Sequence, residues 1–208
     1  MVRVSYIDTA LWTAADYERI LSTLSQERRA RAERYQSERD RYLSAGASYL
    51  LDCALKEMGK CEREAQYTFN EHAKPYMGGV YFNLSHSGTV SALAVGDHEV
   101  GVDVQKLGPV TDRLIERVCT ESEQKLIKES GDGERAFFRL WTAKESAGKF
   151  LGTGLSEPKA FEIDLKYGRV TLRGETLKAV LKEYPLDGYA LFACANEPFE
   201  SELQQIKL

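Results

Sequence analysis

The stretch that decides the fold prediction is Val-Gly-Val-Asp-Val-Gln at residues 100–105. Alternate residues of a β-strand point to opposite faces, so the three valines share one face and Asp103 and Gln105 share the other. The valine face can pack against a core, which leaves a carboxylate and an amide side by side on the opposite face. An edge strand with a solvated Asp103 fits the same residues, so the interpretation depends on the neighbouring segments.

A second segment carries the other charged groups: Phe138 to Leu155, with Trp-Thr-Ala-Lys-Glu-Ser followed by Gly-Thr-Gly-Leu. Helical spacing puts Trp141, Glu145 and Lys149 on one stripe, and Lys144 sits beside them in the sequence. A surface Glu–Lys pair would account for two of these residues. It would not account for the tryptophan on the same stripe or for the Gly-x-Gly that follows.

A third segment, Asn83 to Gly88, reads Asn-Leu-Ser-His-Ser-Gly and predicts a strand end before a turn. The Ser85 hydroxyl, the His86 imidazole and backbone N–H groups can together bind an anion. A Ser–His hydrolase is the catalytic alternative, but the Gly-x-Ser-x-Gly elbow is missing, and neighbouring strand residues point to opposite faces. A turn histidine with only a structural role is the other alternative.

The region from Glu27 to Arg41 is rich in arginine and also contains Glu27, Glu33, Glu38 and Asp40. Such mixed charge is typical of a solvated helix with surface salt bridges. The functional alternative is one wall of a phosphate pocket, because the guanidinium fork binds phosphate oxygens in pairs.

Helical and strand patterns come in blocks, which favours an α+β fold. Helices are predicted at 14–24, from Ser25 onward, and at 42–58, 121–129, 134–151 and 175–183. Strands are predicted at 2–6, 67–70, 80–84, 90–95, 100–104, 160–165, 169–172 and 189–195. A change of character near Val100 suggests two lobes, residues 1–100 and 101–208.

Composition narrows the functional class. The chain has 208 residues and a net charge of −4, which argues against a nucleic-acid-binding surface. Its four cysteines match no zinc spacing, so we expect free thiols in the reducing cytoplasm. No secretory signal is visible, and no apolar run approaches the roughly 20 residues that a membrane span needs.

Together, a strand carboxylate, a helix glutamate beside lysines and a Ser-His turn are the parts of a divalent-metal phosphoryl-transfer site. Magnesium prefers oxygen ligands and keeps water and substrate phosphates in its shell. In such chemistry the protein mainly positions groups and neutralises charge.

The order and spacing of these motifs resemble the Sfp-type 4′-phosphopantetheinyl transferases. The resemblance rests on Phe-Asn-Leu-Ser-His-Ser (82–87), Gly-Val-Asp-Val (101–104) and the 141–155 segment, with weaker matches at Lys74-Pro75-Tyr76 and 24–35. It implies an α+β fold of two similar lobes related by a pseudo-two-fold axis, with coenzyme A in the cleft between them.

The resemblance also implies roles for individual residues. Asp103 and Glu145 would ligate Mg²⁺, with Mn²⁺ as the alternative, and Gln105 stands where many members carry an acid. Residues implied in binding coenzyme A are Ser85, His86, Lys144 and Lys149 at the phosphates, Lys74 at the adenosine, Arg28 and Arg31 near the 3′-phosphate, and Arg41 at a basic position before the long helix.

The implied enzyme is a holo-[carrier protein] synthase, in which a carrier serine attacks coenzyme A and 3′,5′-adenosine diphosphate leaves. Glu145 would act as the base and Lys149 would offset the charge on the pyrophosphate. The alternatives are a non-catalytic coenzyme A or nucleotide-binding module and a metal-dependent phosphate-ester hydrolase. A cytoplasmic monomer is expected, and carriers of fatty-acid, polyketide and nonribosomal peptide synthesis all fit.

Overall fold

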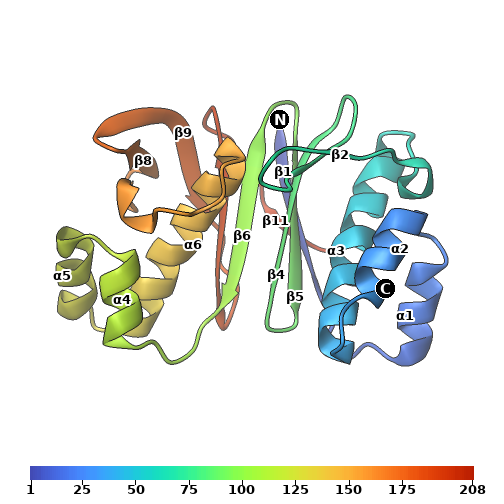
Figure 1. Ribbon diagram of the computed structural model, residues 1–208, viewed down its shortest axis with the longest axis horizontal. Coiled ribbons are helices and arrows are strands. Elements are labelled where there is room, and N and C mark those ends of the chain that lie inside the picture. Colours follow the sequence, from blue (N-terminus) through green and yellow to red (C-terminus); the bar gives the residue numbers. More distant parts are fainter.

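The fold is a four-layer arrangement in which two β-sheets lie between two groups of helices (Figure 1). It is described from a computed structural model that covers all residues, 1–208. The four-stranded sheet has the order β11-β1-β5-β4, and the five-stranded sheet has the order β6-β10-β9-β8-β7. None of the helices combines the length and the apolar character that crossing a membrane requires.

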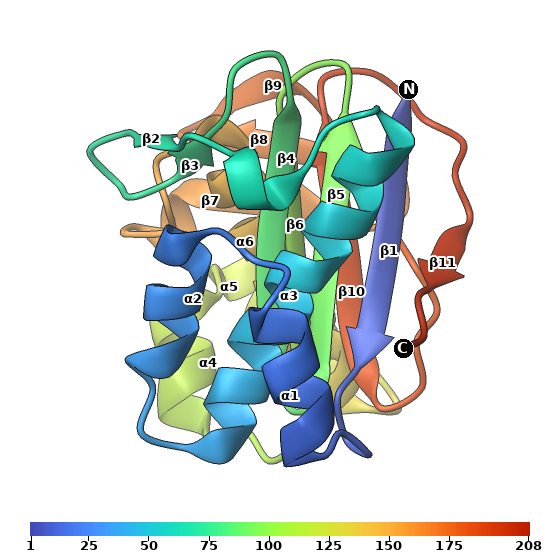
Figure 2. The same ribbon diagram turned by 90° about the vertical axis from the view of Figure 1, so that its right-hand side faces the viewer.

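The first half is built on the four-stranded sheet, and its helices cover the outer face (Figure 2). Thr13, Ser25 and Ser37 cap the three helices by accepting a backbone N–H bond, as Ser and Thr commonly do. Its elements are β1 (Val2–Asp8), α1 (Ala14–Leu21), α2 (Gln26–Glu33), α3 (Glu38–Glu57), the 3₁₀ turn η1 (Glu62–Glu64), β2 (Thr68–Phe69), β3 (Pro75–Tyr76), β4 (Tyr81–Ser87) and β5 (Val90–Gly96).

The second half is built on the five-stranded sheet, with α6 packed along it. Its elements are β6 (Val100–Lys106), α4 (Asp112–Val118), α5 (Glu121–Glu129), α6 (Gly133–Leu151), the 3₁₀ turn η2 (Pro158–Ala160), β7 (Phe161–Asp164), β8 (Arg169–Leu172), β9 (Glu175–Glu183) and β10 (Tyr189–Ala195). The last strand, β11 (Leu203–Gln205), returns to the first sheet and pairs in parallel with β1. The final strand therefore belongs to the sheet of the first half.

The two halves share one topology, which is the pseudo-two-fold relation that the resemblance implied. In the first, β1 leads into α3, then β4 and β5, and the strands lie in the order β1-β5-β4. In the second, β6 leads into α6, then β9 and β10, and the order is β6-β10-β9. A long helix covers the outer face in each case, so both halves are α+β.

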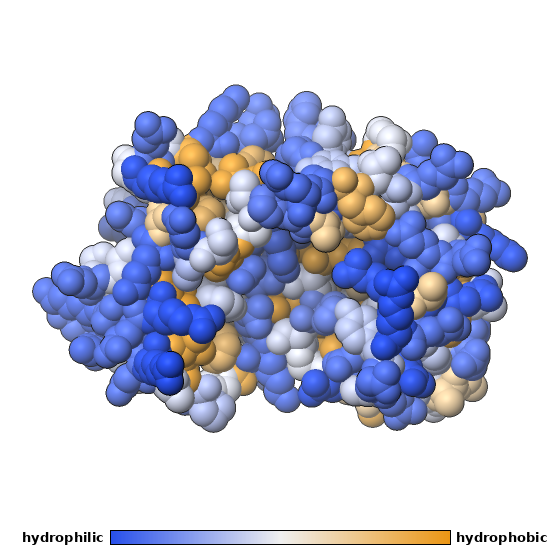
Figure 3. Space-filling view, in the orientation of Figure 1, coloured by the Kyte–Doolittle hydropathy of each residue, from blue (hydrophilic) through white to orange (hydrophobic).

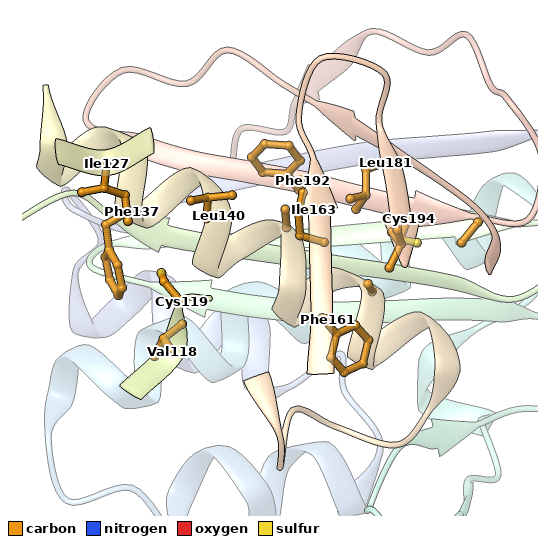
Figure 4. Close-up of a cluster of buried hydrophobic side chains, with 14 residues drawn as sticks. Val118, Cys119, Ile127, Phe137, Leu140, Phe161, Ile163, Leu181, Phe192 and Cys194 are labelled. Carbon is orange, nitrogen blue, oxygen red and sulfur yellow. The ribbon is translucent and has the colours of Figure 1, made fainter. Parts of the chain in front are cut away.

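Four apolar clusters hold these layers together, and two of them position the candidate site. Inside the second half, α6 packs on its sheet through a cluster that includes Phe137, Leu140, Phe161 and Phe192 (Figure 4). Between the sheets lies a second cluster that contains the three valines at 100, 102 and 104. The burial of these valines confirms the alternation predicted for β6. Asp103 therefore lies on the other face of the strand, toward α6 and the first half.

Strands β4 and β6 run side by side where the halves meet, but side chains rather than backbone carbonyls join them. Asn83 Oδ1, Ser85 Oγ and Ser87 Oγ accept hydrogen bonds of 3.0, 3.3 and 3.0 Å from the backbone N–H groups of every second residue over 102–106. We call this contact the β4–β6 seam. It fixes the register between the halves at the level of the candidate site.

Gly101 sets how closely α6 approaches β6. A Cβ atom there would lie 2.1 Å from the backbone oxygen of Ser146 and 2.5 Å from the backbone nitrogen of Phe150. The helix backbone cannot move aside unless the whole helix shifts. Gly101→Ala is therefore expected to lower the free energy of unfolding by about 1–3 kcal/mol or more. Urea unfolding measures the loss, with Gly108→Ala as the control because a Cβ there meets nothing within 4 Å. Equal stability of both variants would contradict the prediction.

Most predicted elements are confirmed, including Glu121–Glu129 and Arg169–Leu172 at their predicted bounds. The helix predicted at 175–183 is wrong, because this segment forms strand β9. Leu177, Ala179 and Leu181 share one face at period two, and this alternation prevailed over the helix-forming Glu and Lys residues of the same segment. Helix α4 and strand β11 were not predicted.

Candidate active site

Two adjoining cavities lie where the halves meet. The larger, the main cavity, has a volume of about 300 Å³, and the smaller, the side cavity, about 200 Å³. Both are lined by Arg28, Arg31, Leu84 and Lys149, so they form one continuous site. The face of the molecule in Figure 3 is mainly hydrophilic across the region where the two halves meet.

Asp103 is the central carboxylate of the main cavity and is only 2% exposed. Its Oδ1 accepts hydrogen bonds from Lys149 Nζ at 2.5 Å and from Ser85 Oγ at 2.7 Å. Its Oδ2 accepts one from Gln105 Nε2 at 2.9 Å. Lys149 Nζ also donates to Ser85 Oγ at 2.9 Å. The buried charge is therefore paired with a lysine and held by two further donors, as a buried carboxylate requires.

Glu145 lines the same cavity from α6, one helical turn before Lys149. Its carboxylate forms no hydrogen bond within the chain, unlike that of Asp103. Burial raises the pKa of Glu145, the negative charge of Asp103 raises it further, and Lys149 opposes the shift. A carboxylate without a partner and with a raised pKa is suited to accepting a proton.

The oxygen-rich side of the main cavity fits a magnesium ion. Asp103 and Glu145 face one cavity and raise the electrostatic cost of each other's charge, so a cation between them would be favourable. Two carboxylates fit Mg²⁺, which usually takes one or two and completes its shell with water and substrate phosphates.

The first half gives the site a basic wall. Arg28, Arg31 and His86 line the main cavity from that side, with Arg28 only 6% exposed. Burial lowers the pKa of His86, and the positive charges of Lys149 and Arg31 lower it further. This concentration of positive charge would attract a polyanionic ligand.

Lys74 lines the side cavity, but its ammonium group is bound within the protein. Nζ donates to Glu99 Oε2 at 2.6 Å and to the carbonyl oxygen of Phe150 at 3.2 Å. Nearby, Asn70 Nδ2 donates to the carbonyl oxygen of Gly152 at 2.8 Å. The β2–β3 segment is thus tied to the end of α6 at the side cavity.

Two of the candidate residues are not brought to the site. Lys144 is fully buried (0% exposed), and its Nζ donates to Glu123 Oε2 at 2.6 Å and to the carbonyl oxygens of Val118 and Pro158. Successive helix residues lie about 100° apart, so Lys144 leaves α6 on a different face from Glu145. Arg41 donates from Nε to the carbonyl oxygen of Tyr35 at 2.8 Å and lines neither cavity.

Helix α3 contributes a wall of the main cavity through Ser44 and Ala47, which were not predicted as site residues. The run Ser-Ala-Gly-Ala-Ser at 44–48 was the available signal, because small residues on a long helix allow another element to approach closely. Glu62, in the turn after α3, was not predicted either, and the sequence holds no comparable signal for it.

Fold and site together define an enzyme of the phosphoryl-transfer class: two carboxylates and a lysine face a basic wall across a site between two α+β halves.

The comparisons with known proteins give the particular family. Residues 99–194 match the model of the 4′-phosphopantetheinyl transferase superfamily. The phosphopantetheinyl transferase psf-1 of Bacillus pumilus is 31% identical over 91% of this chain and 86% of its own length. The 4′-phosphopantetheinyl transferase ffp of Bacillus subtilis is 28% identical over 93% of this chain and 91% of its own length. The 4′-phosphopantetheinyl transferase HetI of a Nostoc species is 31% identical over 70% of this chain and 67% of its own length. The chain belongs to the 4′-phosphopantetheinyl transferase superfamily.

Proposed function

We propose that the chain transfers the 4′-phosphopantetheine arm of coenzyme A to a serine of an apo acyl or peptidyl carrier protein. The oxygen of the serine forms a bond to the β-phosphorus of coenzyme A, and the bond from that phosphorus to the bridging oxygen breaks. The products are the holo carrier and 3′,5′-adenosine diphosphate. The observation that carries the proposal is the pair Asp103 and Glu145, which face one basic cavity in a chain of this superfamily.

In the proposed mechanism, Glu145 accepts the proton of the attacking serine hydroxyl. Its unpartnered carboxylate and raised pKa support this role. Lys149 offsets the charge that develops on the pyrophosphate, and Ser85 keeps Lys149 and Asp103 aligned. Asp103, Glu145 and the amide oxygen of Gln105 would hold Mg²⁺, which supplies further positive charge to the pyrophosphate.

The basic wall would hold the remainder of coenzyme A. We assign the 3′-phosphate to Arg28 and Arg31, the phosphates to His86 and Lys149, and the adenosine end to the side cavity near Lys74. Bidentate arginine contacts suit a phosphate dianion. Lys74 would act mainly by holding the wall of the side cavity, because its ammonium is already bound to Glu99.

We further propose two lobes, 1–100 and 101–208 with β11 added to the first, and a monomer in the cytoplasm. A single chain provides both sides of the cavity, which supports a monomer. All four cysteines are free thiols, which supports a reducing compartment.

Incubating the protein with Mg²⁺, a fluorescent coenzyme A and an apo carrier protein tests this function. Fluorescence covalently attached to the carrier is the expected result, and a carrier whose serine is changed to alanine is the control. Binding without labelling would favour the non-catalytic module. Release of free phosphopantetheine would favour the hydrolase.

Gln105→Glu is expected to tighten Mg²⁺ binding about tenfold, equivalent to about 1.4 kcal/mol. The present amide donates to Asp103, whereas a carboxylate would repel it and would gain from a cation between them. Isothermal titration with Mg²⁺ and a coenzyme A analogue measures the change, and Gln105→Ala serves as the control for loss of the amide. Unchanged affinity in Gln105→Glu would contradict the proposed metal position.

A further inference from the structure

Glu62 is a buried carboxylate outside the cavities, and the proposed chemistry has not used it. It is 0% exposed and lies at the start of the 3₁₀ turn that follows α3. It accepts hydrogen bonds from Ser25 N at 2.6 Å, Ser25 Oγ at 2.8 Å and Tyr67 OH at 2.8 Å. Ser25 is the N-cap of α2, so Glu62 anchors the start of the helix that carries Arg28 and Arg31.

Arg28 lies directly beside this carboxylate. Its Nε is 4.0 Å from Glu62 Oε1, and both side chains are almost completely buried. The guanidinium carbon lies 4.6 Å from the ring centre of Tyr67 and 5.9 Å from that of Phe82. Arg28 is therefore held by a carboxylate and two aromatic rings, both favourable partners for a guanidinium.

The hydrogen-bonding capacity of Arg28 is not used up by these contacts. Its buried Nη2 has no hydrogen-bond partner within the chain, although Arg28 lines both cavities. A buried donor without a partner is costly and needs an explanation. A ligand that binds at this wall would supply one, because an anion can accept from the guanidinium that Glu62 holds in place.

Tyr67 completes the arrangement. Burial is the main reason that the pKa of Tyr67 is raised, so its hydroxyl stays protonated and donates to Glu62. The same ring stacks on Arg28, so one side chain links the carboxylate to the guanidinium.

We infer that Glu62 is a positioning residue that orders Arg28 in advance for a phosphate dianion of the substrate. The inference rests on the proposed function, in which this phosphate is the 3′-phosphate of coenzyme A. A carboxylate that fixes a guanidinium before binding lowers the ordering cost that the ligand would otherwise meet. Glu62 contacts no substrate atom itself and acts only through Arg28 and the start of α2.

The test is Glu62→Gln, which keeps the size and one acceptor oxygen and removes the charge. We expect KM for coenzyme A to rise about tenfold or more, the loss typical of a charge-assisted contact, with kcat changed by less than about twofold. Affinity for 3′,5′-adenosine diphosphate, measured by calorimetry, should fall by the same factor. KM for 3′-dephospho-coenzyme A should stay the same. The control is Glu64→Gln, an exposed glutamate of the same turn.

A double-mutant cycle separates positioning from a general structural role. In an Arg28→Ala background, Glu62→Gln should add little further loss of 3′,5′-adenosine diphosphate affinity, because the group that it orders is gone. A full additional loss there, or an unchanged KM in the single variant, would overturn the inference. If Glu62→Gln fails to fold, Tyr67→Phe removes one donor to Glu62 and keeps the stacked ring. It should raise KM for coenzyme A and leave KM for the 3′-dephospho substrate unchanged, and no rise would overturn the inference.

The two proposals fail in different ways. A wild-type protein that labels no carrier would overturn the proposed function. A wild-type protein that labels the carrier, together with a Glu62→Gln variant of unchanged KM and unchanged 3′,5′-adenosine diphosphate affinity, would overturn only the role of Glu62.

Discussion

Glu145→Gln is expected to lower kcat for carrier labelling by about 10²–10⁴-fold, the usual contribution of a general base. The glutamine keeps the shape of the side chain but cannot accept the serine proton. Because Glu145 forms no hydrogen bond within the chain, the substitution should leave the fold intact, and removing a partly buried charge should not destabilise it.

Stopped-time labelling gives kcat, and thermal unfolding verifies the fold. The matched control is Glu134→Gln, an exposed acid in the first turn of the same helix, which should label normally. Labelling by Glu145→Gln at more than about a tenth of the wild-type rate would remove Glu145 from the role of base. Intact Mg²⁺ affinity with lost labelling would separate the proton transfer from metal binding.

Lys144→Met is expected to lower the free energy of unfolding by about 3–5 kcal/mol, the cost of leaving a buried charge without its partner. Glu123 is nearly as buried as Lys144, and the carbonyl oxygens of Val118 and Pro158 would lose a donor as well. Urea unfolding measures the loss, and Lys125→Met on the surface of α5 is the control.

The same experiment distinguishes this structural role from the phosphate contact implied by the family resemblance. Adding Glu123→Leu to Lys144→Met should recover much of the stability, because an apolar pair replaces a buried ion pair. A Lys144→Met variant of wild-type stability, with a raised KM for coenzyme A, would instead return Lys144 to the phosphates.

The contrast between Glu145 and Lys144 shows how far the sequence could predict the site. Residues spaced four apart on a helix share a face whatever surrounds it, so Glu145 and Lys149 were correctly expected to lie together. Lys144 leaves the helix on another face, and whether that face is exposed or paired with Glu123 depends on the packing of α5 on α6. Such a contact is set by tertiary structure and leaves no local pattern.

In the fold, too, some elements follow from the local sequence pattern and others depend on tertiary contacts. Strand β6 could be predicted because its valines alternate and no competing helical pattern is present. The segment 175–183 contains both helix-forming residues and a period-two alternation, so its sequence fits either structure. Only its neighbours β8 and β10 settle the choice. Glu62 is a further example, since its importance comes from Ser25 and Arg28, which lie far from it in the sequence.

The β4–β6 seam also limits how this sequence can evolve. At positions 83, 85 and 87 the partner is a backbone N–H of β6, so only a short side chain with an acceptor oxygen can serve. Ser85 meets this demand while also binding Asp103 and Lys149. Assembly of the halves and the proposed chemistry therefore make demands on the same atom, so replacing Ser85 would disturb both. The Asn-x-Ser-x-Ser spacing would then persist even in a descendant that had lost its catalytic activity.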